Sequence, residues 1–306
     1  MSYLQNLKII ILFFTLSLFF SNKVFSQETN PFCGEKFWKD ATHLKVDSFI
    51  KKGHDMMERC KWTGLPAIYT AFTVMDDIKV RKVLEKHNLN FLIVDNSTTY
   101  SKGINLLHAA AAGKIPENID FLVGKGVGIN AREGSDGFTP LHTACTRNNI
   151  KIVQSLINNG AKLNALDTEG RSCLYKAVRW KNNQQIEFLL KKGASFNLSQ
   201  CEKCYSILNL YLSDGFNDES IDPIIIQLLI DYGYSPNEVQ KSGEEIYAGR
   251  TTLGAFIENE RYPRDKRPII DILLRNGADI NQREYRINSW TNKLMTDLKT
   301  PIFYAI

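Results

Sequence analysis

The sequence is poor in the residues that define several specialised classes of protein. Six cysteines among 306 residues are too few for a small secreted scaffold held together mainly by disulfides. Nineteen glycines and nine prolines exclude a collagen-like or linker-like chain. The formal net charge is only +5, which is too balanced for a dedicated nucleic-acid-binding protein. With 43% hydrophobic and 23% charged residues, the composition predicts a folded protein of moderate size.

Long apolar runs are also scarce, and the one that exists lies at the N-terminus. Lys8 precedes an apolar run over residues 9–20, which is shorter than the roughly 20 residues that a membrane-spanning helix needs. This pattern is typical of a secretory signal peptide. Val24 and Ser26 suit the small-residue pockets of a signal peptidase, so we expect cleavage after Ser26. An uncleaved N-terminal anchor is the alternative.

Three parts are therefore expected: a signal peptide over residues 1–26, a short segment over 27–35 and a folded region over 36–306. Cleavage would also remove Lys8 and Lys23 and lower the formal charge to +3. We expect an exported protein, periplasmic or secreted, in an oxidising compartment where disulfides persist. After cleavage, neither a membrane nor a nucleic acid is expected as a partner.

The folded region is repetitive. Val153, Leu156 and Ile157 lie seven, four and three residues before Gly160, and these offsets place the three apolar side chains on one stripe of a helix that a glycine then ends. The same triplet precedes His87 and five further glycines: Gly53, Gly126, Gly193, Gly233 and Gly277. The intervals between these markers run from 33 to 44 residues, which indicates a repeat architecture with inserts.

A second pattern lies between the markers. Its clearest copy has a tight turn at Asp136-Gly137, a helix-capping Thr139 and a proline at the first helical position. Weaker copies occur at 68–71, 106–110, 172–177, 251–253 and 300–305. Each copy predicts an inner helix, and all but the last copy precede a marked outer helix.

Together these motifs resemble the ankyrin repeat. Residues 139–144 read Thr-Pro-Leu-His-Thr-Ala and match the opening motif of that family, and residues 277–281 read Gly-Ala-Asp-Ile-Asn and match its close. Residues 160–164 and 193–197 match the close in part. The resemblance runs from about Lys36 to the last residue. It implies an all-α, right-handed solenoid of stacked helix-turn-helix units with hairpin fingers, in six to seven repeats of which the last is incomplete.

The resemblance also implies a function. Ankyrin proteins as a class bind other proteins and are rarely enzymes, so we expect a protein partner at the concave face, no catalytic site and no cofactor. The variable positions of the family mark the expected partner-binding residues, and aromatic and arginine side chains among them are the types that dominate interfaces. These residues are Ser135, Asp136, Phe138, Thr146, Arg147, Thr168, Glu169, Arg171, Arg179 and Trp180.

Several apparent catalytic features have structural interpretations. His108 and His142 fall in the helix-opening position, where the resemblance implies an imidazole that ties neighbouring loops together. The glycine-rich residues 124–128 follow a predicted helix, whereas a phosphate loop needs a strand before it and a helix after it. No Gly-x-Ser-x-Gly or His-Glu-x-x-His signature occurs.

Cys201 and Cys204 have the spacing of half a zinc site. A zinc site needs four ligands, and the nearest histidine, His142, lies two repeats away. In an exported protein we favour a local disulfide between the two cysteines, and we expect no metal.

The other four cysteines fall into two pairs. Cys33 and Cys60 flank the first predicted helix pair, and we expect a second disulfide there. Cys145 and Cys173 are interpreted as small apolar core residues without a further role.

The last third of the region departs from the repeat pattern. Residues 213–223, 238–250 and 258–268 are polar inserts, and an enzyme or effector site in the first and third of them is the alternative to a pure binding protein. Residues 300–306 begin a further inner helix and then stop. This half repeat is expected to be the remnant of a longer array, an interface for a partner or a second copy, or a crude cap.

Overall fold

The computed structural model describes residues 30–61, 63–75, 78–87, 90–95, 102–134, 136–147, 149–201, 204–212, 221–238, 251–258, 266–281, 286–288 and 293–295. The expected signal peptide, Ser135, the half repeat at 300–306 and most of the three inserts lie outside these ranges. The chain divides into two compact units, Met1–Asn88 and Leu89–Ile306.

The first unit contains two helix pairs. Its elements are η1 (Pro31–Cys33), α2 (Glu35–Lys39), α3 (His43–Lys51), α4 (Ala67–Val74) and α5 (Ile78–Lys86). Helix α2 packs against α4 and α3 packs against α5. Phe32 is fully buried, with its ring centroid 5.1 Å from Phe37 and 5.6 Å from Trp38. The disulfide between Cys33 and Cys60 joins the start of this core to the chain that leads into α4.

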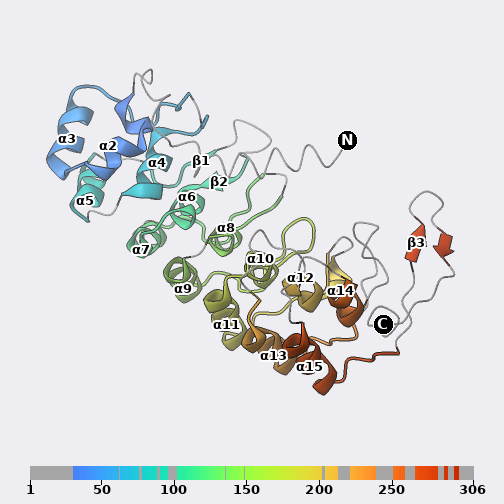
Figure 1. Cartoon of the computed structure of the whole chain (residues 1–306). Helices are drawn as coiled ribbons and strands as arrows, with labels where there is room; N and C mark the ends of the chain where they lie inside the picture. The colour runs from blue at the N-terminus through green and yellow to red at the C-terminus, as the bar shows by residue number, and fades with distance from the viewer. Residues whose placement is uncertain are drawn as a thin grey trace. The chain divides into compact units, whose positions relative to one another are not determined.

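The second unit stacks five helix pairs in two rows (Figure 1). The inner row consists of α6 (Leu106–Ala112), α8 (Pro140–Cys145), α10 (Cys173–Arg179), α12 (Ile207–Leu212) and α14 (Thr252–Glu258). The outer row consists of α7 (Pro116–Gly124), α9 (Ile150–Asn158), α11 (Asn183–Lys191), α13 (Pro223–Asp231) and α15 (Arg267–Arg275). Each helix contacts the next helix of its own row, so the buried core runs without a break along the stack.

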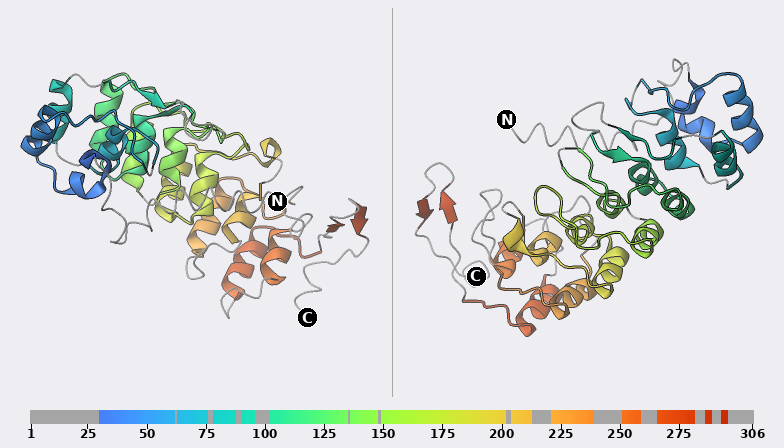
Figure 2. Two further views of the ribbon diagram at one scale, coloured as in Figure 1. Left: turned by 90° about the horizontal axis from the view of Figure 1, so that it is seen from above. Right: turned by 180° about the vertical axis from the view of Figure 1, so that it is seen from behind.

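Short strands and a 3-10 turn complete the second unit. Strands β1 (Val94–Asp95) and β2 (Ile104–Asn105) pair antiparallel before α6, and η2 (Leu198–Gln200) lies between α11 and α12. Strands β3 (Arg286–Asn288) and β4 (Lys293–Met295) form a hairpin after α15. The turned views in Figure 2 show the stacked helices from above and from behind. Within the described ranges, every helix is too short or too polar to span a bilayer.

The helix ends follow the sequence pattern closely. At the start of α8, Thr139 accepts a hydrogen bond from the backbone N–H of His142 at 3.4 Å, and Pro140 occupies the first turn where no N–H is needed. The six marker glycines all have φ between 80° and 93°, the left-handed conformation that ends a helix. The predicted all-α ankyrin-repeat solenoid, with its helix-turn-helix units, is confirmed.

Neighbouring fingers approach one another so closely that glycine is required at two positions, because a side chain there would have no space. A Cβ atom at Gly103 would collide with the carbonyl oxygen of Arg132 in the next finger. A Cβ atom at Gly170 would collide in the same way with the carbonyl oxygen of Gln200. Stacked finger backbones therefore exclude any larger residue at these two positions.

All six cysteines are bonded, and one pair differs from expectation. Cys145 and Cys173 form a disulfide between the neighbouring inner helices α8 and α10, with their Cα atoms 5.5 Å apart. The interpretation of these residues as unpaired core thiols is therefore wrong. Close packing of the two helices brings the Cα atoms within disulfide range, and a separation of 28 residues in the sequence gave no sign of it. Cys201 is bonded to Cys204.

Candidate protein-binding surface

Two histidines tie successive fingers together. The Nε2 atom of His108 donates to the carbonyl oxygen of Phe138, and that of His142 donates to the carbonyl oxygen of Arg171, both at 3.1 Å. In each case Nδ1 accepts the backbone N–H of the residue that caps the helix, at 3.2 Å. Burial lowers the pKa of both imidazoles to about 4, so both are neutral at pH 7. The structural interpretation of these histidines is confirmed.

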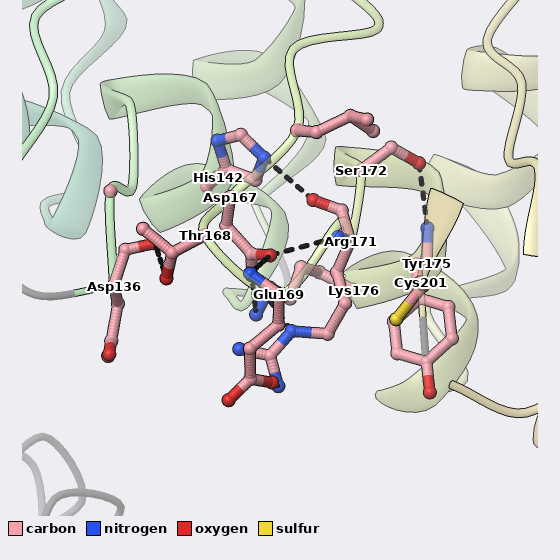
Figure 3. Close-up of polar contacts among 12 residues, drawn as sticks. Asp136, His142, Asp167, Thr168, Glu169, Arg171, Ser172, Tyr175, Lys176 and Cys201 are labelled. Atoms are coloured by element: carbon pink, nitrogen blue, oxygen red, sulfur yellow. Dashed lines mark hydrogen bonds and ion pairs between the residues drawn. The ribbon is translucent and has the colours of Figure 1, made fainter. Parts of the chain in front are cut away.

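Asp167 is the centre of a buried polar cluster within the next finger (Figure 3). Its carboxylate accepts the backbone N–H groups of Glu169 at 3.0 Å and Arg171 at 2.9 Å. It also pairs with Nε of Arg171 at 2.8 Å and with Nζ of Lys176 at 2.9 Å. Burial by itself raises the pKa of this carboxyl, but attraction to Lys176 and Arg171 outweighs burial and leaves the pKa below its ordinary value.

Lys176 connects this cluster to the preceding finger. Its ammonium group lies 4.2 Å from the centroid of the Phe138 ring, a cation–π contact, while its side chain is only 7% exposed. Phe138 is stacked on His142 with a centroid distance of 5.9 Å. Burial lowers the pKa of Lys176 to about 8. The sequence reasoning missed Asp167 and Lys176; the signal was a lysine within the otherwise apolar helix at 174–178.

Glu133 is a further buried acid of the same finger as Phe138. Its residue is 8% exposed, and its backbone N–H donates to the carbonyl oxygen of Phe138 at 2.8 Å. Burial raises the pKa of the Glu133 carboxyl to about 8, and repulsion from Asp136 adds to the rise while Lys176 opposes it. At pH 7 this side chain is therefore mostly protonated.

Five of the predicted partner-binding residues gather on these two fingers. We call this set the finger group: Asp136, Phe138, Thr168, Glu169 and Arg171. The carbonyl oxygen of Asp136 accepts both the backbone N–H of Thr168 at 2.9 Å and its hydroxyl at 3.1 Å, so the fingers are joined directly. Glu169 and Arg171 form an ion pair. Thr168 and Glu169 are exposed, and Phe138 and Arg171 are half-buried.

The other four described residues lie at the opposite ends of the inner helices. We call them the helix-end group: Thr146, Arg147, Arg179 and Trp180. Thr146 caps α8 and donates its hydroxyl to the carbonyl oxygen of Thr143 at 2.8 Å, whereas Trp180 caps α10. Arg179 is exposed and Arg147 is half-buried. The seven residues of α10 separate the two groups by about 10 Å along the helix axis.

Metal ligands are not gathered in this part of the chain. Among the residues that the structure describes, no group of three His, Cys, Asp or Glu side chains could hold a metal ion. The sulfur atoms of Cys201 and Cys204 are bonded to each other.

Comparisons with known proteins agree with this geometry. A family model described as "Ankyrin repeats (3 copies)" matches residues 106–200. A putative ankyrin repeat protein of fowlpox virus, FPV031, is 36% identical over 168 residues, covering 52% of this chain and 45% of the viral protein. A probable 26S proteasome regulatory subunit of Saccharomyces cerevisiae, p28, is 33% identical over 96 residues, covering 30% of this chain and 42% of the yeast protein.

A solved structure supports the fold alone. The ankyrin repeat domain of human ASB11 superposes with a TM-score of 0.51 at 18% identity, covering 74% of this chain and 85% of that domain. The chain spans less than half the length of the two curated relatives. Residues 106–200 are therefore ankyrin repeats, in a solenoid of that fold.

Proposed function

We propose that this chain binds another protein through the finger group and the helix-end group, and that it does so in an exported compartment. Ankyrin repeats are protein-interaction modules and are generally not enzymes. One observation carries the choice of surface: interface-forming side chains such as Phe138 and Arg171 stand at the predicted variable positions of two fingers that a backbone hydrogen bond holds together. A partner would meet a surface whose backbone is already ordered.

The oxidation state of the cysteines supports export. Three disulfides account for all six cysteines of the sequence, and disulfides persist in oxidising compartments such as a periplasm or the extracellular space. The apolar segment at 9–20 would direct the chain there, with the mature protein beginning at Gln27. Intact-mass analysis of the exported chain tests this step, and a mass that retains residues 1–26 would contradict cleavage.

Site-specific cross-linking tests the binding surface. A photo-reactive amino acid is placed at Thr168 in the finger group or at Arg179 in the helix-end group, both exposed. Matched controls carry it at Lys151 on α9 and at Glu187 on α11, which are exposed positions of the outer row. We expect a discrete cross-linked protein in the native compartment from the first two positions only. Equal cross-linking from the outer row would show that the surface is wrongly assigned.

A further inference from the structure

Basic residues recur at the turns that join inner to outer helices. Three successive turns follow α6, α8 and α10, over residues 113–115, 146–149 and 180–182. They contain Lys114, Arg147 and Lys181, and Arg179 is the last residue of α10. None of the three turns contains an aspartate or glutamate. These three turns, in consecutive repeats, therefore carry basic residues and no acid, and together with Arg179 we call them the edge of the repeat stack.

The backbone of this edge is fixed by the repeat that follows each turn. The side-chain amide of Asn149 donates to the carbonyl oxygen of Lys114 at 3.4 Å. The amide of Asn182, which is the equivalent residue of the next repeat, donates to the carbonyl oxygen of Arg147 at 3.5 Å, and Gln185 donates to the same oxygen. These bonds keep Lys114 and Arg147 in register one repeat apart.

Three of the basic side chains on this edge have no acidic partner among the described residues. Lys114, Arg147 and Arg179 form no ion pair within the part of the chain that the structure describes. Arg147 is half-buried, and burial lowers the pKa of its guanidinium. A desolvated arginine without an anion gains from any carboxylate that reaches it, because charge-assisted bonds replace the lost hydration.

The distance between neighbouring repeats along this edge determines how far apart the carboxylates of a bound segment must be. Packed helices lie about 8–10 Å apart, so equivalent residues of neighbouring repeats have about that spacing. An extended peptide advances about 3.3 Å per residue, so every third residue meets the next repeat. We propose that this edge binds an extended acidic segment of the partner protein, with carboxylates three residues apart opposite Lys114 and Arg147, which are equivalent residues of neighbouring repeats. A further carboxylate of the same segment pairs with Arg179, which directly precedes the next equivalent position, Trp180. This inference rests on the proposed protein-binding function and specifies the partner.

Fluorescence anisotropy with synthetic peptides tests the inference on the full chain. The probe is a labelled peptide with glutamate at every third position and serine between, and it is compared with a peptide in which the same glutamates are contiguous and with one carrying lysine instead. We expect the evenly spaced peptide to bind most tightly, and the affinity to fall with added salt. Equal affinity for all three peptides would overturn the inference.

Charge-removing variants locate the binding site. Arg147→Gln should weaken binding about tenfold and Arg179→Gln about threefold, since an exposed pair contributes less than a partly desolvated one. Lys191→Gln, at an exposed position of α11, is the matched control and should leave the affinity unchanged. Unchanged circular dichroism melting of each variant shows that folding is intact. A loss from Lys191→Gln as large as that from Arg147→Gln would mean that only net charge is sensed, and would overturn the site.

Competition and cross-linking experiments distinguish a failure of the acidic-segment proposal from a failure of the proposed protein-binding function. An oligonucleotide of equal charge that displaces the peptide would overturn the assignment of a protein segment as ligand. If Thr168 still cross-links to a partner while the acidic peptide fails to bind, the proposed function stands and the acidic edge does not. If both fail, protein binding through this surface is itself refuted.

Discussion

The buried charge cluster makes a sharp prediction for Asp167→Asn. Asparagine has nearly the same size and can still accept the backbone N–H groups of Glu169 and Arg171, so the turn keeps its bonds. What is lost is the negative charge opposite two cations. Arg171 retains Glu169, but Lys176 loses its ion-pair partner and is left as a 7% exposed ammonium against the face of Phe138.

The magnitude follows from that uncompensated charge. Removing one partner of a buried ion pair costs about 3–5 kcal/mol, and the choice of asparagine places the expected loss near the lower figure, about 3 kcal/mol. Lys176→Met in the same chain removes the stranded charge and replaces it with an apolar side chain against Phe138. The double variant should therefore recover to within about 1 kcal/mol of the original protein.

Urea unfolding of the four chains of this double-mutant cycle, followed by circular dichroism, measures the coupling. Glu187→Gln with Lys191→Met, an exposed pair on α11, is the matched control and should leave the unfolding midpoint unchanged. The reasoning is refuted if the losses from Asp167→Asn and Lys176→Met simply add in the double variant. Additive losses would mean that the two side chains do not depend on each other.

Three further predictions concern pH and the fingers. The Glu133 carboxyl has a pKa of about 8 when folded, so the unfolded chain holds fewer protons from about pH 4.5 upward and stability falls toward pH 8. Glu133→Gln should therefore gain on the order of 4 kcal/mol at pH 8 and nothing near pH 4, by urea unfolding at both values. His108 and His142 have pKa values of about 4 when folded, so the unfolded chain binds more protons below pH 6.5 and stability falls as the pH drops toward 4. The NMR resonances of their imidazole protons should therefore not titrate between pH 8 and 5. A titration midpoint near pH 6.5 would contradict the buried hydrogen bonds that join the fingers. Gly160→Ala, at a left-handed position with open space around it, should lower the free energy of unfolding by about 1 kcal/mol. Gly170→Ala should lower it by at least about twice as much, because its Cβ atom meets the backbone of Gln200. Equal urea unfolding midpoints for the two variants would contradict the close approach of the fingers.

The features that could be read from the sequence are those that each repeat encodes locally. The apolar triplets before Gly160 and its equivalents specify where an outer helix lies and where it ends, because helix periodicity and the left-handed cap are properties of short segments. The roles of His108 and His142 could likewise be inferred from their position in the helix-opening motif.

Contacts between neighbouring repeats could not be read in the same way. The repeat pattern shows that Cys145 and Cys173 face the interior, but the 5.5 Å separation of their Cα atoms depends on how α8 and α10 pack. The burial of Lys176 has the same origin, since its partners Asp167 and Phe138 belong to two successive fingers. From the sequence alone, a lysine in an inner helix is expected to face solvent, and only the packing of the two neighbouring fingers shows that it is buried.

The two groups of candidate binding residues share one support. The disulfide between Cys145 and Cys173 joins α8 to α10, and Lys176 of α10 joins Asp167 of one finger to Phe138 of the finger before it. The finger group at one end of these helices and the helix-end group at the other are therefore carried by the same cross-linked pair of inner helices. Because ordering a surface before a partner arrives lowers the entropy lost on binding, a partner that reaches both groups gains from their being held on this one cross-linked pair of repeats.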